Sequence, residues 1–437
     1  MERIIMKDLY KWKKDTKRKP LIIRGARQVG KSHTVTEFGG KFFNGKVLVV
    51  NFEKQPDWHA IFDKNLDVKR IVSELEIVLN STIEPGHTLL FFDEIQECKN
   101  AILSLRYFYE QIPELHVIAA GSLLDFALED ISFPVGRVQL MNMHPMNFYE
   151  FLLAENKASL ADLIAKEPQR VSEVVDKTIK MELKKYFYVG GMPECVKTFV
   201  ETQSYIKVSD IQDNLIETFR QDFSKYAGKT DKNCLLSVLK SVAQKTGEQI
   251  KYSELAIGFS NPTIKKSFDL LETAKLFYKV QAVPKIEQPL GVNVSARKFK
   301  SLMLDIGLLS RINGLSLSDE YLKNDISSLF RGKLSEQFVG QEFLTAGLKN
   351  LYYWARDAKN SNAEIDIILQ KGNKMIPVEV KSGSSGKLKS LHMCLQSHTD
   401  IEYGAVFSDA AYGINNEHKI HFIPLYFAYS FAAGSNK

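Results

Sequence analysis

The sequence predicts an α/β protein with a parallel, helix-covered sheet in its N-terminal part and a second, smaller α/β domain at its C-terminal end. Short apolar runs alternate with segments of helical spacing from residue 21 to residue 140, which is typical of a parallel sheet covered on both faces. The first apolar run leads into a glycine-rich loop, and a later one ends in two adjacent carboxylates. Near the C-terminus, two strand-like runs flank the turn residues Gly372-Asn373.

Length and composition place the chain among ordinary globular proteins. Its 437 residues suffice for about two or three domains, and 44% are hydrophobic and 25% charged. No apolar run approaches the length of a membrane span, and the first residues lack the apolar core of a signal peptide. We therefore expect a cytoplasmic protein without membrane contact. Four widely spaced cysteines without a C-x-x-C pair predict free buried thiols rather than disulfides or zinc.

The loop after the first apolar run matches the pattern G-x-x-x-x-G-K-[ST]. A loop without side-chain bulk can aim several backbone N–H groups at a polyphosphate, and the following helix adds the positive end of its dipole. Lys31 is expected to reach the β- and γ-phosphates of ATP, and the Ser32 hydroxyl to bind Mg²⁺. The predicted nucleotide-binding residues are Gly25, Ala26, Arg27, Gln28, Val29, Gly30, Lys31, Ser32 and His33.

A plain glycine-rich turn before an amphipathic helix is the alternative for this loop. The four fixed positions match by chance in on the order of one such chain in a hundred. Because the match also lies between a strand-like run and a helix-like one, the context favours nucleotide binding.

The run Thr88-Leu-Leu-Phe-Phe-Asp-Glu-Ile95 predicts a buried strand that ends in Asp93 and Glu94. At the carboxyl edge of a parallel sheet, Asp93 can hold the Mg²⁺ shell while Glu94 polarises the attacking water. The next strand, from His116, ends at Ser122, where a small polar residue can sense the γ-phosphate. A simple strand-ending turn is the alternative for Ser122. No N-K-x-D motif occurs, which argues against a GTPase.

These motifs resemble those of prokaryotic AAA-type ATPases with a C-terminal domain of unknown function. The resemblance covers nearly the whole chain and rests on the phosphate loop, Phe92-Asp-Glu-Ile-Gln96, Gly121-Ser122, Gly136-Arg137, Pro145-Met-Asn-Phe148 and Gly190-Gly-Met-Pro-Glu194. It implies an AAA-like P-loop NTPase fold with a helical lid. It also implies that Arg137 acts as an arginine finger or sensor on the γ-phosphate; a surface arginine after a turn is the alternative. Ser32 departs from the family, which more often has Thr there, but either hydroxyl binds Mg²⁺.

The middle of the chain is basic. Residues 229–310 contain thirteen Lys or Arg and seven Asp or Glu, an excess of six that equals the net charge of +6 of the whole chain. Helical segments over 235–243, 252–255 and 261–271, followed by two strands, predict a winged helix. Its third helix would offer Thr263, Lys265 and Lys266 to a DNA major groove. Winged helices also dock proteins, and the local charge favours DNA.

The last part of the chain contains a predicted hairpin with ionisable residues on one face. If Gly372-Asn373 forms a two-residue turn, Asp366 faces Glu379 and Glu364 faces Lys381. Two opposed carboxylates repel each other, and a divalent cation such as Mg²⁺ or Mn²⁺ would relieve this.

Asp366 and Glu379-Val-Lys381 resemble the PD-(D/E)-x-K pattern of restriction-endonuclease-like folds, although no proline precedes Asp366. The resemblance implies that the carboxylates bind metal, that Lys381 orients the attacking water, and that Glu336 is the acidic residue of the preceding helix. An inactive sheet with a Glu364–Lys381 salt bridge is the alternative.

We thus expect an ATPase core over 1–155, a helical lid or connector over 156–228, a winged-helix-like module over 229–310, and a restriction-endonuclease-like domain over 311–437. The leading hypothesis is an Mg²⁺-dependent ATPase coupled to DNA. An ATP-gated, metal-dependent nuclease and a nucleotide-switched protein scaffold with little turnover are the alternatives. Oligomer formation is compatible with each of them.

Overall fold

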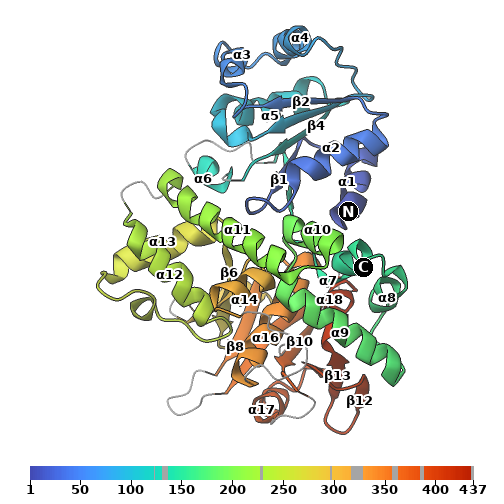
Figure 1. The fold of residues 1–437 in the computed structure, drawn as a ribbon, viewed down its shortest axis with the longest axis vertical. Coiled ribbons are helices and arrows are strands. Elements are labelled where there is room, and N and C mark those ends of the chain that lie inside the picture. The colour runs from blue at the N-terminus through green and yellow to red at the C-terminus, as the bar shows by residue number, and fades with distance from the viewer. Residues whose placement is uncertain are drawn as a thin grey trace. The chain divides into compact units, whose positions relative to one another are not determined.

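The computed structural model describes residues 1–122, 124–129, 136–226, 230–295, 298–315, 328–356, 363–383 and 388–434. The chain forms two compact units, Glu2–His144 and Pro145–Lys437, whose elements are labelled in Figure 1. Within the described ranges, no helix is both long and apolar enough to cross a membrane.

The N-terminal unit is built on a parallel sheet, as predicted. Five strands lie in the order β2-β3-β4-β1-β5 and every neighbouring pair is parallel. The strands are β1 Leu21–Arg24, β2 Val47–Asn51, β3 Leu89–Asp93, β4 His116–Ala120 and β5 Gln139–Asn142. The helices are α1 Ile5–Lys14, α2 Lys31–Phe42, α3 Ala60–Asp63, α4 Val68–Leu79, α5 Lys99–Gln111 and α6 Leu124–Glu129, with 3₁₀ turns η1 Pro56–His59 and η2 Ile95–Glu97.

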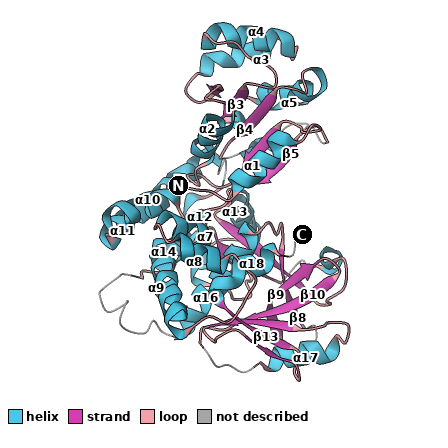
Figure 2. Ribbon diagram, turned by 90° about the vertical axis from the view of Figure 1, so that its right-hand side faces the viewer, coloured by secondary structure: helices cyan, strands magenta, loops and turns pink. Residues whose placement is uncertain are grey.

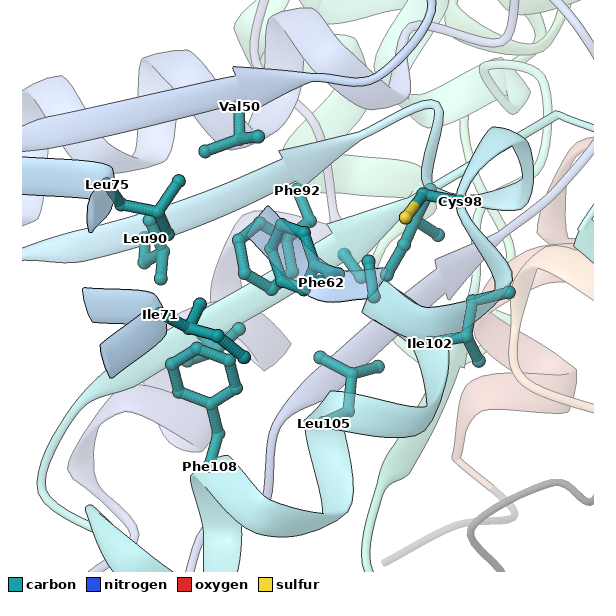
Figure 3. Packing of buried hydrophobic residues seen from close by; sticks show 14 of the residues in the cluster. Val50, Phe62, Ile71, Leu75, Leu90, Phe92, Cys98, Ile102, Leu105 and Phe108 are labelled. Carbon is teal, nitrogen blue, oxygen red and sulfur yellow. The ribbon is translucent and has the colours of Figure 1, made fainter. Parts of the chain in front are cut away.

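One face of this sheet is covered by α3, α4 and α5, which enclose an apolar core (Figure 3). Every residue of β3 is buried, as expected for a central strand covered on both faces. Phe92 of β3 is fully buried, and its ring centroid lies 5.7 Å from Phe52, 5.6 Å from Phe62 and 5.7 Å from Phe108. Edge-to-face rings at such distances add to the free energy gained by burial.

The C-terminal unit contains an eight-stranded mixed sheet in the order β12-β13-β11-β10-β9-β8-β6-β7. Figure 2 shows β8, β9 and β10 side by side in this sheet. The strands are β6 Phe277–Val283, β7 Phe299–Met303, β8 Leu351–Ala355, β9 Glu364–Lys371, β10 Lys374–Val380, β11 Gly404–Ser408, β12 Gly413–Asn415 and β13 Ile420–Pro424. The longer helices are α7 Phe148–Ala154, α8 Ala158–Ile164, α9 Glu173–Val189, α10 Pro193–Thr202, α11 Tyr205–Tyr226, α12 Lys232–Gln244, α13 Asn261–Thr273, α14 Ile306–Ile312, α16 Ser328–Thr345, α17 Lys389–Ser397 and α18 Ala428–Ala433.

The hairpin predicted as the wing belongs to the same sheet as the C-terminal strands. β6 and β7 pair antiparallel, as predicted, but β6 also pairs parallel with β8. The expected boundary between residues 310 and 311 is therefore not a break in this sheet. The second of the three predicted helices is only a 3₁₀ turn, η3 Tyr252–Glu254, whereas α12 and α13 form as expected.

The helices expected as a lid pack within the C-terminal unit. α9 ends at Gly190-Gly191, where the chain approaches α14 so closely that a Cβ on Gly307 would lie 2.7 Å from the Gly190 nitrogen. The buried Asp305 carboxylate caps α14 and also accepts a hydrogen bond of 2.6 Å from the Gly191 amide. Because Gly191 lies between α9 and α10, this carboxylate connects these two helices to the start of α14 within the C-terminal unit.

Replacing Phe92 by alanine should strongly destabilise the N-terminal unit. The change removes a fully buried ring that contacts three others, and such truncations cost about 3–5 kcal/mol. Urea unfolding followed by circular dichroism measures this cost. As a control in the same unit, Ile77→Ala removes a side chain that is 75% exposed and should change stability by no more than about 0.5 kcal/mol. Equal losses in the two variants would contradict the core assignment.

Candidate functional site

The phosphate loop connects the end of β1 with the first residue of α2, as the motif requires. Gly30 adopts φ 93° and Gly25 adopts φ 155°, conformations that favour glycine. A Cβ on Gly25 would also lie 2.2 Å from the carbonyl oxygen of Met143. The loop is held from the other side by the buried Arg3 guanidinium, which donates to the carbonyls of Val29 and His144 at 2.9 and 2.7 Å. The Arg3 hydrogen bond therefore helps to hold the loop backbone in place, and no side chain projects from the loop at Gly25 or Gly30.

The other predicted loop residues fall into two groups. Ala26 and Val29 are fully buried, so their contribution to ligand binding is limited to their backbone. His33 is 76% exposed at its side chain, and its Nδ1 lies 3.8 Å from Glu37 one helical turn later. Gln28 is exposed with φ 62°.

The ammonium group of Lys31 is folded back onto the loop. It donates hydrogen bonds of 2.9 and 2.8 Å to the carbonyl oxygens of Gly25 and Ala26, and only 6% of the residue is exposed. Burial lowers the pKa of Lys31 to about 8, although the nearby Glu94 and Asp93 carboxylates act in the opposite direction. The two carboxylates predicted to accompany Lys31 are thus close enough to interact with it electrostatically.

Asp93 lies where a magnesium ligand is expected. One of its oxygens accepts a hydrogen bond of 2.7 Å from the Ser32 hydroxyl, and the other accepts one of 3.0 Å from the Asn51 amide. Burial raises the pKa of Asp93, and the hydrogen bonds from Ser32 and Asn51 oppose that rise. A hydroxyl and a carboxylate that meet beside the phosphate loop match the oxygen ligands that Mg²⁺ prefers. The residues present therefore fit a magnesium ion bound together with a nucleotide.

Glu94 follows directly in a left-handed conformation with φ 49°, which is uncommon for a non-glycine residue and often marks a functional site. The Gln96 amide donates to its carboxylate at 2.7 Å, and the Ser122 hydroxyl lies 3.5 Å from the same oxygen. The structure thus brings Ser122 to Glu94, as the sequence predicts for strand ends at one edge of the sheet.

Three residues for which the motifs did not indicate a role also touch the site: Arg3, Asn51 and Gln96. Asn51 ends β2, so a polar residue after an apolar strand was an available signal. Gln96 belongs to a quoted motif but was given no task. Arg3 had no local signal, because its contacts with Val29 and His144 connect residues far apart in sequence.

Arg137 is not at the phosphate loop of its own chain. It precedes β5, whose first residue pairs with Leu21 at the start of β1, whereas the loop follows the end of β1. Its guanidinium forms an ion pair of 2.9 Å with Glu110 and is 46% exposed. Arg137 therefore lies near the end of β1 that is opposite the phosphate loop.

The predicted recognition helix α13 begins as expected, with the Ser260 side chain capping the Thr263 amide and Pro262 in the first turn. Its inner face buries Ile264 and Phe268. On the outer face, Lys265 pairs with Asp269 at 2.5 Å, and Lys266 is exposed. The basic residues of this helix therefore lie on its solvent side, and its recognition role stays a prediction.

The C-terminal hairpin has the predicted register as far as Ile367↔Val378, which stops short of the predicted pairs Asp366–Glu379 and Glu364–Lys381. β9 and β10 pair antiparallel from Lys371↔Lys374 to Ile367↔Val378, and the turn residue Gly372 has φ 58°. Beyond this point, β9 has a bulge, since Tyr352 pairs with Ile368 and Trp354 with Ile365.

The cation among the carboxylates is a lysine of this chain. The Lys300 ammonium of β7 lies 2.5 Å from Glu364, 3.0 Å from Glu336 and 3.3 Å from Asp366. Lys381 pairs with Glu379 at 2.5 Å, and Glu364 pairs with Lys300 instead of forming the salt bridge to Lys381 of the alternative interpretation. In the part of the chain that the structure describes, no group of three or more His, Cys, Asp or Glu side chains is arranged to hold a metal ion. The expectation of an Mg²⁺ or Mn²⁺ site here is not supported.

The charges of this cluster are unequal, because four carboxylates face two ammonium groups. Burial would lower the pKa of Lys300, but the Glu336, Asp366 and Glu364 carboxylates outweigh it and raise that pKa well above its usual value. Burial raises the pKa of Glu336 to about 8. Burial and the neighbouring Asp366 raise the pKa of Glu379 to about 7. The cluster therefore retains protons near neutral pH.

Comparison with known protein families agrees with the geometry of the N-terminal unit. Residues 17–152 match the family model of an AAA domain. The N-terminal unit is a P-loop domain of the AAA type. Residues 180–320 and 331–427 match two domains of unknown function, DUF8612 and DUF4143. Neither match identifies a winged helix or a nuclease.

Individual relatives are distant. An uncharacterized protein of Haemophilus influenzae is 28% identical over 252 residues, which cover 56% of this chain and 53% of that protein. The match thus spans about half the length of this curated relative. A Walker-type ATPase of Pyrococcus abyssi is 13% identical, with a TM-score of 0.43 over 70% of this chain and 94% of the other. The AMPPCP-bound DnaA of Aquifex aeolicus is 14% identical, with a TM-score of 0.29 over 61% and 86%. Such low scores say nothing about the substrate of this chain.

The raised pKa of Glu336 predicts that stability falls as the pH rises. A glutamate normally loses its proton near pH 4.5, so between that pH and about 8 the folded chain binds a proton that the unfolded chain has lost. Over this window the free energy of unfolding should fall by up to about 1.4 kcal/mol per pH unit. Glu336→Gln, which keeps a neutral side chain opposite Lys300, Glu364 and Asp366, should show a shallower fall. Urea unfolding of both proteins from pH 5 to 9 measures it, and parallel curves would contradict the assignment.

Proposed function

We propose that this chain is an Mg²⁺-dependent ATPase whose hydrolytic centre is formed by Lys31, Ser32, Asp93 and Glu94. The observation that supports it most is the Ser32–Asp93 hydrogen bond of 2.7 Å, which brings the end of the phosphate loop and the end of β3 together. Lys31 lies beside this pair and interacts with both acidic residues. A hydroxyl, a carboxylate, a lysine and a second carboxylate in one place are the groups that phosphoryl transfer to water requires.

In this proposal each group has a separate task. Ser32 and Asp93 hold Mg²⁺, which neutralises charge on the phosphates when it is bound. Lys31 exchanges its two carbonyl partners for phosphate oxygens, and Glu94 accepts hydrogen bonds from the attacking water. Ser122 lies beside Glu94 and is placed to sense the γ-phosphate. Arg137 could complete the site only as a residue contributed by a neighbouring copy.

Lys31→Ala should reduce ATP hydrolysis by roughly 10²-fold or more and weaken ATP binding, because it removes the cation that contacts the phosphates. Lys41→Ala is a matched control, since Lys41 lies on the same helix, is 56% exposed and pairs with Glu37 on the helix surface. Phosphate release measures turnover, and fluorescence of a labelled ATP analogue measures binding. Unchanged hydrolysis in Lys31→Ala would contradict the proposal. Glu94→Gln should retain ATP binding while turnover is lost.

We further propose that the ATPase is coupled to DNA through α13. Its support is the outer face of this helix, where Lys265 and the exposed Lys266 follow a capped first turn. A helix inserted into a major groove presents its N-terminal residues to the bases. The Asp269 partner of Lys265 would be exchanged for a phosphate.

Charge reversal of Lys265 and Lys266 together should weaken binding of duplex DNA more than tenfold. The slope of log affinity against log salt should become shallower by about 1.8, because two phosphate contacts are lost. Fluorescence anisotropy over a salt series measures both quantities. Lys177→Glu with Lys197→Glu makes the same charge change at side chains that are 71% and 65% exposed on α9 and α10. If this control loses as much affinity, the effect comes from net charge and not from α13.

The turnover assay distinguishes one of the two alternative functions, and a plasmid-cutting assay distinguishes the other. A protein-binding scaffold would bind ATP with little turnover whether or not DNA is present. A nuclease would cut plasmid DNA with Mn²⁺, and the position of Lys300 among the carboxylates argues against this activity.

A further inference from the structure

The resemblance to restriction-endonuclease-like folds implies a divalent metal held by Asp366 and Glu379, and the residues present do not fit such an ion. The Lys300 nitrogen lies between three carboxylates at 2.5 to 3.3 Å, distances of ion pairs and hydrogen bonds. Magnesium requires oxygen ligands at about 2.0–2.1 Å in a near-octahedral arrangement. The oxygens around Lys300 are thus spaced for an ammonium group.

The remaining oxygens of the presumed ligands are also engaged. The second oxygen of Asp366 accepts a hydrogen bond of 2.8 Å from the Val380 amide, which fixes this carboxylate to the backbone of β10. One oxygen of Glu379 accepts from Lys381 at 2.5 Å. The other, Oε2, is buried and has no hydrogen-bond partner within the described ranges. The ion pairs of Lys300 thus reach Glu336, Glu364 and Asp366 but leave this oxygen of Glu379 without a partner in the described part of the chain.

We infer that the Lys300 ammonium takes the place of a divalent metal ion among Glu336, Glu364 and Asp366. The cluster then excludes a divalent metal and acts as a junction, a buried group of ion pairs that links separate elements of the C-terminal unit. The side chain of Lys300 is 2% exposed, and a buried ammonium is stable only if it is paired and hydrogen-bonded. Its three partners come from α16 and β9, while Lys300 itself comes from β7. The junction therefore ties the hairpin that packs against α12 and α13 to the centre of the C-terminal sheet.

Removing the lysine should turn the junction into a metal site. In Lys300→Met the side chain keeps most of its length but loses its charge, so four acidic groups would face the single ammonium of Lys381. A divalent cation would relieve that repulsion, and binding to the folded state would stabilise it by mass action. We expect the melting temperature of Lys300→Met to rise with Mn²⁺ concentration. Any effect of Mn²⁺ on the melting temperature of the unmodified chain should not require Glu336, Asp366 or Glu379.

The test uses the full chain without nucleotide, with Mn²⁺ titrated and the free ion followed by electron paramagnetic resonance. Lys300→Met should bind one Mn²⁺ more than the unmodified chain, and Asp366→Asn in the Lys300→Met background should remove it. Lys285→Ala, which deletes a lysine that is 66% exposed, should leave binding unchanged. Any Mn²⁺ held by Asp93 is common to all four proteins and cancels in the comparison.

Two results would overturn the inference. The first is equal Mn²⁺ binding by folded Lys300→Met and the unmodified chain, since exclusion by the ammonium would then be wrong. The second needs no Lys300 variant: if the chain with Lys300 binds Mn²⁺ or cuts plasmid DNA, and Asp366→Asn or Glu379→Ala abolishes this, the centre is a metal site. Mn²⁺ binding by the unmodified chain that Asp366→Asn leaves intact supports the inference. The ATPase proposal is independent of each outcome.

Discussion

The parallel pairing of the central strands determines where every group of the phosphate site lies. Ile23 of β1 and Asp93 of β3 both pair with Ala120 of β4, and Asn51 of β2 pairs with Asp93. These residues form one row across the sheet, close to the carboxyl end of each strand. The loop after β1, the carboxylates of β3 and Ser122 after β4 must therefore emerge at the same edge. The side-chain hydrogen bonds among Ser32, Asp93 and Asn51 follow from this alignment.

The sequence was most informative where function depends on local backbone. The glycines of the phosphate loop adopt the positive φ angles that the motif requires. Asp93, at the end of β3, lies beside Ser32 at the carboxyl edge of the sheet, as predicted. The hairpin register followed from the turn Gly372-Asn373 alone, because a two-residue turn fixes every pair beyond it until a bulge intervenes. In both cases a few adjacent residues contained the whole signal.

Lys300 could not be found in this way, because its partners Glu336 and Asp366 are joined to it only by the packing of the second sheet. In the sequence it is one of thirteen Lys or Arg residues of a basic segment. In the structure it is buried among carboxylates that lie outside this segment, so it contributes no free charge to the surface. Composition therefore overstates the positive field of this segment. Likewise, the alternation of residues along β6 and β8 does not indicate that these two strands, distant in sequence, pair with each other.

That pairing has a consequence for how the protein can be divided. The two regions matched by separate families of unknown function, 180–320 and 331–427, contribute β6–β7 and β8–β13 to a single sheet. A fragment that ends between them would expose the hydrogen-bonding edge of β6 on one piece and of β8 on the other, and open edges of this kind recruit foreign strands. The two regions are thus halves of one folding unit, and the natural point of dissection is His144, where the first sheet is already complete.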